Sequence, residues 1–282
     1  MNPGALGAIF EDRPNPLDKF IESADEIEGK SKVPVALRLF GGAGLEHQKK
    51  YGTRDETFAR VSQKARLHAK HNPRAIFRNE VSIEEVLSSP PMHGVLTRLQ
   101  CCPPTCGAAA ALLTSEKFAK NHGLRSDVKM TGQSMTTDFS SSFEGKTMMQ
   151  IVGSDMSQAA ANDLYERAGI GPEDVDVVEL HDCFTSNEII TYEALQLTEE
   201  GGSEQFVSDG DNTYGGKVVV NPSGGLLSKG HPLGATGLGQ CAELVWQLRG
   251  EAGLRQVEGA RVGLQHNLGL GGACVVSLYQ KM

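Results

Sequence analysis

Residues 221–237 leave the backbone of this chain little freedom. They read Asn-Pro-Ser-Gly-Gly-Leu-Leu-Ser-Lys-Gly-His-Pro-Leu-Gly-Ala-Thr-Gly, and their five glycines and two prolines fix a path that bulkier residues could not follow. His231 is held between Gly230 and Pro232 ahead of a predicted helix, which suits proton transfer or oxyanion donation. A glycine-rich phosphate loop is the alternative, but the spacing matches neither GxGxxG nor GxxxxGK followed by Ser or Thr.

Strands and helices alternate around this loop. Alternation of this kind predicts an α/β fold with a layered sheet, in which active sites gather at the loops that leave the strands. Hydrophobic periodicity predicts strands at 128–137, 175–180, 217–220, 261–265 and 273–279, and helices at 154–168, 185–197 and 236–249, the last closed by Gly250.

A second candidate loop, His181-Asp-Cys-Phe184, follows the predicted strand 175–180. Thr185 and Glu188 predict a capping box at the start of the next helix, and a thiol just before a helix start is favoured as thiolate. His181 and Cys183 could therefore exchange protons with a substrate near neutral pH. The alternative is a histidine and a cysteine that only fill the core.

A third candidate loop, residues 265–272, contains His266 and four glycines or leucines in alternation, followed by Gly272. The glycines permit close approach of a ligand, although His266 could be merely a turn residue. Taken together, the three loops bring three histidines and Cys183 to strand ends. Acyl transfer and carbon–carbon bond chemistry use such a set.

The first hundred residues are predicted to be mainly helical. Residues before about 30 indicate loop with short helices, and helices are predicted at 44–51, 55–71 and 82–88, the last with a capping box from Ser82 and Glu85. In the second helix Lys64 lies off the apolar stripe, and His68 and His71 are predicted to face solvent. The small apolar run 107–113 is predicted to lead into a helix that ends near Lys120.

Composition narrows the function classes. The 282 residues carry 27 Lys and Arg against 35 Asp and Glu, a net charge of −8, which disfavours nucleic acid binding. No stretch approaches the roughly 20 apolar residues of a membrane span, and the N-terminus lacks signal-peptide features. The six cysteines lack a CxxC pair and indicate intracellular thiols; Cys101, Cys102 and Cys106 lack a fourth ligand, so no metal site is predicted.

The sequences HDCF at 181–184, GHPLGATG at 230–237 and HNLGLGG at 266–272 resemble motifs of thiolases of the sterol carrier protein type. Residues 41–52 and 72–79 resemble that family's loop domain, and 99–111 resemble the return into its N-terminal sheet, with Cys106 where the family usually has an acidic residue. The resemblance implies a thiolase-like layered α-β-α-β-α fold. It divides the chain into a loop domain with a remnant of the N-terminal domain (1–98), the end of the N-terminal domain (99–144) and a C-terminal domain (145–282).

The resemblance also implies roles for individual residues. His231 would activate the nucleophile, His181 would occupy an oxyanion-hole or water-holding position that other thiolases fill with Asn, and Cys183 would act as acid and base on the enolate carbon. His266 would line the same pocket. Coenzyme A would be a cosubstrate rather than a permanently bound cofactor, and its contacts would be Ser223, Gly224, Gly225 and Gly269. The implied reaction is thiolytic cleavage of a 3-oxoacyl-CoA in the β-oxidation of lipids or sterol side chains.

The sequence departs from the family at its front. The loop NNxCATG, which bears the acyl-accepting cysteine in the family, has no counterpart among the six cysteines, and the N-terminal half-domain is predicted to be incomplete. Loss of a covalent nucleophile costs about a million-fold in kcat. Thiolysis by this chain alone is therefore expected to be impaired.

Three alternatives follow. The chain could be a thioesterase that uses Cys183 and His231 as nucleophile and base, or a retro-aldolase that needs no acyl-enzyme. It could also be a non-catalytic module that binds acyl-CoA or lipid and pairs with a full-length thiolase. The resemblance implies a homodimer or such a heterodimer, and a peroxisomal location, although the C-terminus is no SKL-type address; otherwise the chain would be cytoplasmic.

Overall fold

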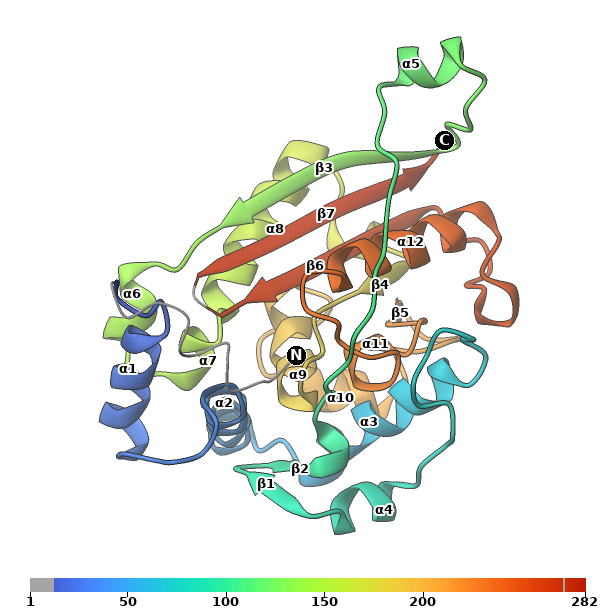
Figure 1. Ribbon diagram of the computed structural model, residues 1–282. Coiled ribbons are helices and arrows are strands. Elements are labelled where there is room, and N and C mark those ends of the chain that lie inside the picture. The colour runs from blue at the N-terminus through green and yellow to red at the C-terminus, as the bar shows by residue number, and fades with distance from the viewer. Residues whose placement is uncertain (1–12, 271) are drawn as a thin grey trace.

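The computed structural model describes residues 13–270 and 272–282, so Gly271 of the third loop and the first twelve residues lie outside the described part (Figure 1). Its centre is a five-stranded mixed sheet in the order β3-β7-β6-β4-β5. β6 runs parallel to β4 and β4 to β5, whereas β7 is antiparallel to both its neighbours. The strands are β3 (Val128–Thr136), β4 (Val177–Glu179), β5 (Val219–Val220), β6 (Val262–Gly269) and β7 (Ala273–Lys281).

Helices cover both faces of this sheet, as the alternation of strands and helices predicted. On β4, Val178 packs into the larger core with α8 (Ser154–Ala168) and α9 (Thr185–Ala194). The neighbouring Val177 points to the other face and packs with Leu244 of α12 (Thr236–Arg249). The two side chains point to opposite faces because a strand alternates its side chains. Both are fully buried, since helices cover each face. The α/β class is confirmed.

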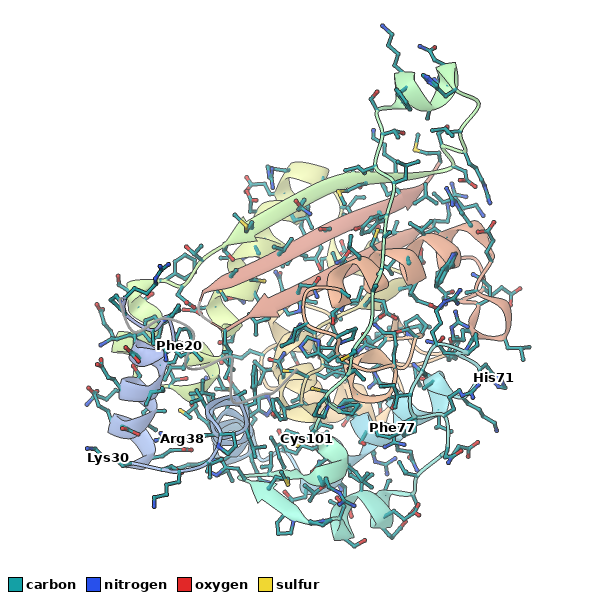
Figure 2. All side chains as sticks on the ribbon, in the orientation of Figure 1. Phe20, Lys30, Arg38, His71, Phe77 and Cys101 are labelled. Carbon is teal, nitrogen blue, oxygen red and sulfur yellow. The ribbon has the colours of Figure 1, made fainter. Side chains whose placement is uncertain are left out.

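The N-terminal helices pack against the helical layer that contains α9. α2 and α3 both contact α9, and α3 also contacts α11 (Gly225–Ser228). Arg38, labelled in Figure 2, joins α1 to α2 through ion pairs with Asp25 and Glu28. These elements are α1 (Asp18–Glu28), α2 (Val35–Tyr51), α3 (Asp55–Ala69), α4 (Ile83–Ser88), β1 (Pro91–His93) and β2 (Leu96–Thr97).

Helix α2 begins at Val35, earlier than the predicted start at Gly44. In the structure a Cβ on Gly41 would meet the carbonyl oxygen of His93 at 2.6 Å, and one on Gly44 would meet Val95 at 2.4 Å. These glycines therefore serve close packing inside a helix.

The prediction that the run 107–113 leads into a helix ending near Lys120 is confirmed. Residues 107–114, which we call the strap, carry no regular structure, and Figure 1 shows them crossing in front of the sheet as a single extended line. A helix forms only at α5 (Glu116–Asn121), after the Ser115 cap. The remaining helices are α6 (Ser140–Glu144), α7 (Met148–Ile151), α10 (Ser203–Ser208) and α11 (Gly225–Ser228), with 3-10 turns at Arg98–Gln100, Pro172–Asp174 and Gly253–Arg255.

Two of the predicted helix caps are confirmed. Ser82 and Glu85 form the predicted capping box of α4, and Gly250 closes α12 in the left-handed conformation. Among the described helices, not one has the length and apolar character that crossing a membrane requires.

Candidate functional site

Three predicted site histidines meet at the ends of neighbouring segments. His181 follows β4, His231 follows α11, and His266 lies within β6. The rings of His181 and His231 stand edge to face with centroids 4.9 Å apart, and the main-chain N–H of His181 points at Nδ1 of His266 at 3.5 Å. His181 and His231 are 50 positions apart in the sequence, and His231 and His266 are 35 apart, yet the three residues lie together in the fold.

Hydrogen bonds assign the proton on His231. Its Nδ1 lies 2.7 Å from the hydroxyl oxygen of Thr236, and that hydroxyl donates to the carbonyl of Pro232. Nδ1 therefore carries the hydrogen and donates to Thr236, which leaves Nε2 with a free lone pair. The main-chain N–H of His231 donates to the Thr105 hydroxyl at 2.7 Å. The backbone and the ring are both held, so the basic nitrogen has a fixed direction.

All three imidazoles are neutral near pH 7. Burial, with the charge of Lys229 as a smaller cause, lowers the pKa of His231 to about 4, and burial lowers the pKa of His266 to about 3. The pKa of His181 is lowered well below its usual value by burial and then by the other two histidines. Neutral rings can both accept and donate a proton or a hydrogen bond, as proton transfer requires.

His266 is no turn residue, contrary to the alternative considered from the sequence. It is fully buried in β6, opposite Val276 of β7. Because its Nδ1 accepts from the His181 main chain, Nε2 carries the hydrogen and donates to the Ser157 hydroxyl at 3.0 Å. Its contact with the site is therefore made through the backbone of His181.

His181 retains an unused polar atom. Its main-chain carbonyl accepts from the Asn187 side chain, but its Nδ1 is buried and has no hydrogen-bond partner in the described chain. An unsatisfied buried polar atom costs about 1–3 kcal/mol. A polar ligand atom or a bound water at this place would remove that cost.

The expectation of a thiolate at Cys183 is wrong. Its side chain is buried, and burial, followed by nearby Cys102 and Asp182, raises its pKa well above the usual value. Burial also raises the pKa of the Cys102 thiol to about 12. The two segments are joined directly, since the Cys102 main-chain N–H donates to the Cys183 carbonyl at 2.9 Å. Cys183 is a protonated thiol here, suited to giving a proton rather than attacking carbon.

The predicted capping box at Thr185 and Glu188 is absent. The Thr185 hydroxyl has no described partner, and Glu188 instead forms a buried ion pair with Lys64 and accepts from Tyr192. Asp182 caps a different helix, because its carboxylate accepts from the main-chain N–H of Leu226 at 2.7 Å at the start of α11. The Cys183 thiol therefore lies beside the Asp182 carboxyl, which raises its pKa further but less than burial does.

Two polar residues of α3 that were predicted to lie off the core or in solvent are buried. Lys64 and His68 are 7% and 5% exposed. Lys64 also donates to the carbonyl of Val220, and Nδ1 of His68 donates to the carbonyl of Asn221 at 3.0 Å. Together with Glu188 they anchor the start of the loop 221–237. His71 is exposed as predicted.

Three of the four predicted coenzyme A contacts are closely surrounded by other atoms of this chain. Ser223 donates to Glu179 from both its main chain and its hydroxyl, and a Cβ on Gly224 would meet Ala69 at 2.5 Å. A Cβ on Gly225 would meet the Asp182 carboxylate at 2.0 Å. Gly269 is exposed, and a Cβ there would find no atom closer than 3.9 Å. Only Gly269 thus offers open space; the coenzyme A roles stay predictions.

The residues that form hydrogen bonds with the site histidines were not predicted from the sequence. They come from other segments: Thr105 from the chain before the strap, Ser157 from α8 and Asn187 from α9. No local sequence pattern predicts a hydroxyl or amide whose hydrogen-bond partner lies far away in the sequence. Thr236 is the exception, because it stands inside the GATG motif. Over the described ranges, no three His, Cys, Asp or Glu side chains form a group that could hold a metal ion.

Comparison with protein families matches residues 140–278 to the thiolase C-terminal domain-like family. Rabbit (Oryctolagus cuniculus) sterol carrier protein 2 is 58% identical over 281 residues, which cover 99% of this chain and 51% of the relative. The chain thus spans about half the length of that relative. The non-specific lipid-transfer protein-like 2 of Caenorhabditis elegans is 45% identical, with 99% of this chain and 69% of the relative covered. An acetyl-CoA acetyltransferase of Methanothermobacter thermautotrophicus is 38% identical, over 93% of this chain and 68% of the relative.

Solved structures give the same fold. The Ltp2-ChsH2(DUF35) aldolase aligns with a TM-score of 0.71 at 20% identity, covering 100% of this chain and 68% of that one. Human mitochondrial 3-ketoacyl-CoA thiolase aligns with a TM-score of 0.60 at 17% identity, covering 86% and 59%.

Proposed function

This chain belongs to the thiolase family, and we propose that it binds coenzyme A thioesters and polarises their carbonyl group for thiolase-type acyl chemistry. One observation carries the proposal: three neutral imidazoles from separate segments converge on one place. The substrate class is a 3-oxoacyl-CoA, in lipid or sterol side-chain β-oxidation. A peroxisomal site of action belongs to the same proposal and rests on resemblance alone.

The hydrogen bonds support a division of labour between the rings. His231 presents an unprotonated Nε2 and acts as the base that takes the proton of an incoming thiol. His181 has the buried, unpartnered Nδ1 and holds the thioester oxygen or its bound water. His266 and Ser157 position the main chain of His181 and do not touch the substrate.

Cys183 has the properties of a proton donor to the enolate carbon. Cleavage of a 3-oxoacyl-CoA leaves an enolate that must be protonated, and a thiol whose pKa is raised by burial keeps its proton until such a strong base is beside it. The same raised pKa disfavours Cys183 as the nucleophile. We therefore expect no detectable thiolysis by the 282-residue chain alone.

The carbonyl stretch of a bound thioester tests the binding half of this proposal. Propanoyl-CoA bound to the chain should show a carbonyl band at lower wavenumber than in water, since a donated hydrogen bond weakens the C=O bond. The shift should persist in His181→Asn, which keeps a side-chain donor, and disappear in His181→Ala. An unshifted band in the unaltered protein would contradict the assignment of His181.

A thiolysis assay tests the other half. The chain is mixed with a 3-oxoacyl-CoA and free coenzyme A, and formation of the shortened acyl-CoA is followed by mass. Robust turnover that Cys183→Ala abolishes would show that the nucleophile is Cys183 after all.

A retro-aldol cleavage of an acyl-CoA is the second candidate. The observation that favours it is the pairing of a free imidazole base on His231 with thiols that stay protonated, because this reaction needs a base and an oxyanion donor but no acyl-enzyme. Mass analysis after incubation with an acyl-CoA separates it from a thioesterase, which would leave an acyl group on Cys183. The non-catalytic alternative predicts binding without any conversion.

A further inference from the structure

One buried amide of α12 contacts the backbone beside two of the site histidines. Gln240 is fully buried, and its side-chain NH2 group donates to the main-chain carbonyl of Leu180 at 3.0 Å and points at that of His266 at 3.5 Å. Leu180 is the residue directly before His181. A single side chain thus joins the end of β4 to β6 at the place where the histidines meet.

The peptide group between Leu180 and His181 is held at both of its polar atoms. Its carbonyl oxygen accepts from Gln240, and its N–H points at Nδ1 of His266 at 3.5 Å. Because a peptide group is planar, these two bonds fix the rotation of the plane that ends at the Cα of His181. Gln240 therefore orients His181 through the backbone.

The same helix also orients His231. The hydroxyl of Thr236, the first residue of α12, accepts from Nδ1 of His231, and Gln240 follows four residues later. Residues four apart lie on one face of a helix. One turn of α12 therefore connects the two rings whose centroids are 4.9 Å apart.

A chain of amides fixes the direction of the Gln240 side chain. The Leu180 carbonyl can only accept, so Gln240 turns its NH2 group there and its oxygen toward Asn267, whose NH2 group donates at 2.5 Å. The Asn267 oxygen accepts from Gln265 at 2.9 Å, and the Gln265 oxygen accepts from the Tyr279 hydroxyl at 2.8 Å. Every donor in the chain therefore points from Tyr279 toward Leu180.

The last glycine of the GATG motif makes room for this chain. A Cβ on Gly237 would meet the side-chain oxygen of Asn267 at 2.6 Å, and the Gly237 carbonyl accepts from the Gln265 amide at 2.9 Å. Asn267 belongs to the motif HNLGLGG. The amide chain thus joins two of the three motifs noted in the sequence.

We propose that Gln240 is a positioning residue, which holds the Leu180–His181 peptide so that the His181 ring stands beside His231, and that the amide chain sets its direction. Gln240 acts through the backbone of His181 and does not touch a substrate. Its effect on a bound thioester rests on the proposed function, whereas its effect on the rings of the free protein does not.

NMR of the ligand-free protein tests the geometry. Gln240→Met keeps the length of the side chain and removes both polar atoms. It should move the Nδ1 signal of His266 to the position of a ring nitrogen without a hydrogen bond. It should also abolish the nuclear Overhauser contact between the ring protons of His181 and His231.

Gln247→Met is the matched control. Gln247 lies two turns further along α12, is 1% exposed, and donates to Glu243 and to the carbonyl of Arg255. This variant should lose stability in urea titration yet leave the histidine signals unchanged. Unchanged signals in Gln240→Met, or equal changes in both variants, would overturn the proposal.

Asn267→Asp tests the direction of the chain while Gln240 stays in place. A carboxylate cannot donate to the Gln240 oxygen, so the amide must turn its NH2 group toward residue 267 and leave the Leu180 carbonyl facing an oxygen. The two NMR changes of Gln240→Met should appear here as well, and unaltered signals would overturn the role of the chain. Asn267 is only half-buried, so this variant keeps the test available if Gln240→Met does not fold.

The carbonyl band of bound propanoyl-CoA separates this inference from the proposed function. The band should lie at lower wavenumber in the unaltered protein and return toward its value in water in Gln240→Met. An unshifted band in the unaltered protein, with the NMR changes present, would refute the contact of His181 with the thioester and support positioning by Gln240. A shifted band that persists in Gln240→Met, with unchanged NMR signals, would refute the role of Gln240 alone.

Discussion

The loop 221–237 and the strap are both glycine- or alanine-rich segments with little regular structure, yet their surroundings are opposite. The loop is held by main-chain bonds to β4, by Glu179 and Asp182, and by Lys64 and His68 of α3. Within the described residues, the strap has no main-chain hydrogen bonds of this kind. The single conformation of the loop therefore depends on the partners around it as well as on its own glycines and prolines.

Removing the buried cation under the loop should have the largest effect. Lys64→Met leaves Glu188 buried without its ion pair, and we expect a loss of about 3–5 kcal/mol in the free energy of unfolding, measured by urea titration. Lys70→Met at the end of the same helix is the control, because Lys70 pairs with Glu80 at an exposed site, and it should leave the urea midpoint unchanged. Equal midpoints for the two variants would refute the idea that the network supports the loop.

The same truncation in both segments gives the most direct contrast. Leu226 is fully buried in the loop and Leu112 is 81% exposed on the strap. Leu226→Ala should cost about 2–5 kcal/mol through lost burial and a cavity. Leu112→Ala should change the stability of the monomer by less than about 0.5 kcal/mol. Thermal and urea unfolding at low protein concentration measure both, and a large loss for Leu112→Ala would mean that the strap packs more tightly than described.

Acid should weaken the loop through His68. Burial lowers the pKa of His68 to about 3, whereas the unfolded chain titrates near pH 6.5. Between these values the unfolded state holds the extra proton, so stability is complete above pH 6.5 and falls as the pH drops toward 3. His68→Gln should reduce that slope by up to about one proton, in urea titrations from pH 7 to 4. His122→Gln, at an exposed histidine directly after α5, is the control; an identical slope in both variants would contradict the burial of His68.

A small loss of stability is expected at Ser157. Ser157→Ala removes the acceptor of the His266 Nε2–H, and we expect a loss of about 1 kcal/mol in the free energy of unfolding. Nitrogen NMR of His266 should show the hydrogen on Nε2 in the unaltered protein. Ser140→Ala, at an exposed serine of α6, should change neither quantity. A hydrogen on Nδ1 would show that His266 does not accept from His181.

Periodicity and caps were enough to predict the strands of the sheet, the start of α4 and the end of α12. They place His181 and His231 at strand and helix ends, from which the meeting of the histidines follows. Local pattern failed where a partner lies far away in sequence. Lys64 looks like a surface residue until Glu188, 124 positions later, is placed beside it, and Thr185 resembles a cap although Glu188 is engaged elsewhere. The alanine run of the strap has helix propensity that the fold overrides. The roles of the site residues stay predictions.

Thr105 lies two residues before the strap, and its hydroxyl accepts from the main chain of His231. The same short stretch bridges Pro104 to His231 and Cys101 to Phe184. It is therefore a tether between the outside of the protein and the interior: a pull on the strap must either break these contacts or carry the imidazole with it. We therefore expect a molecule that binds to the strap to change the direction of the His231 imidazole as well.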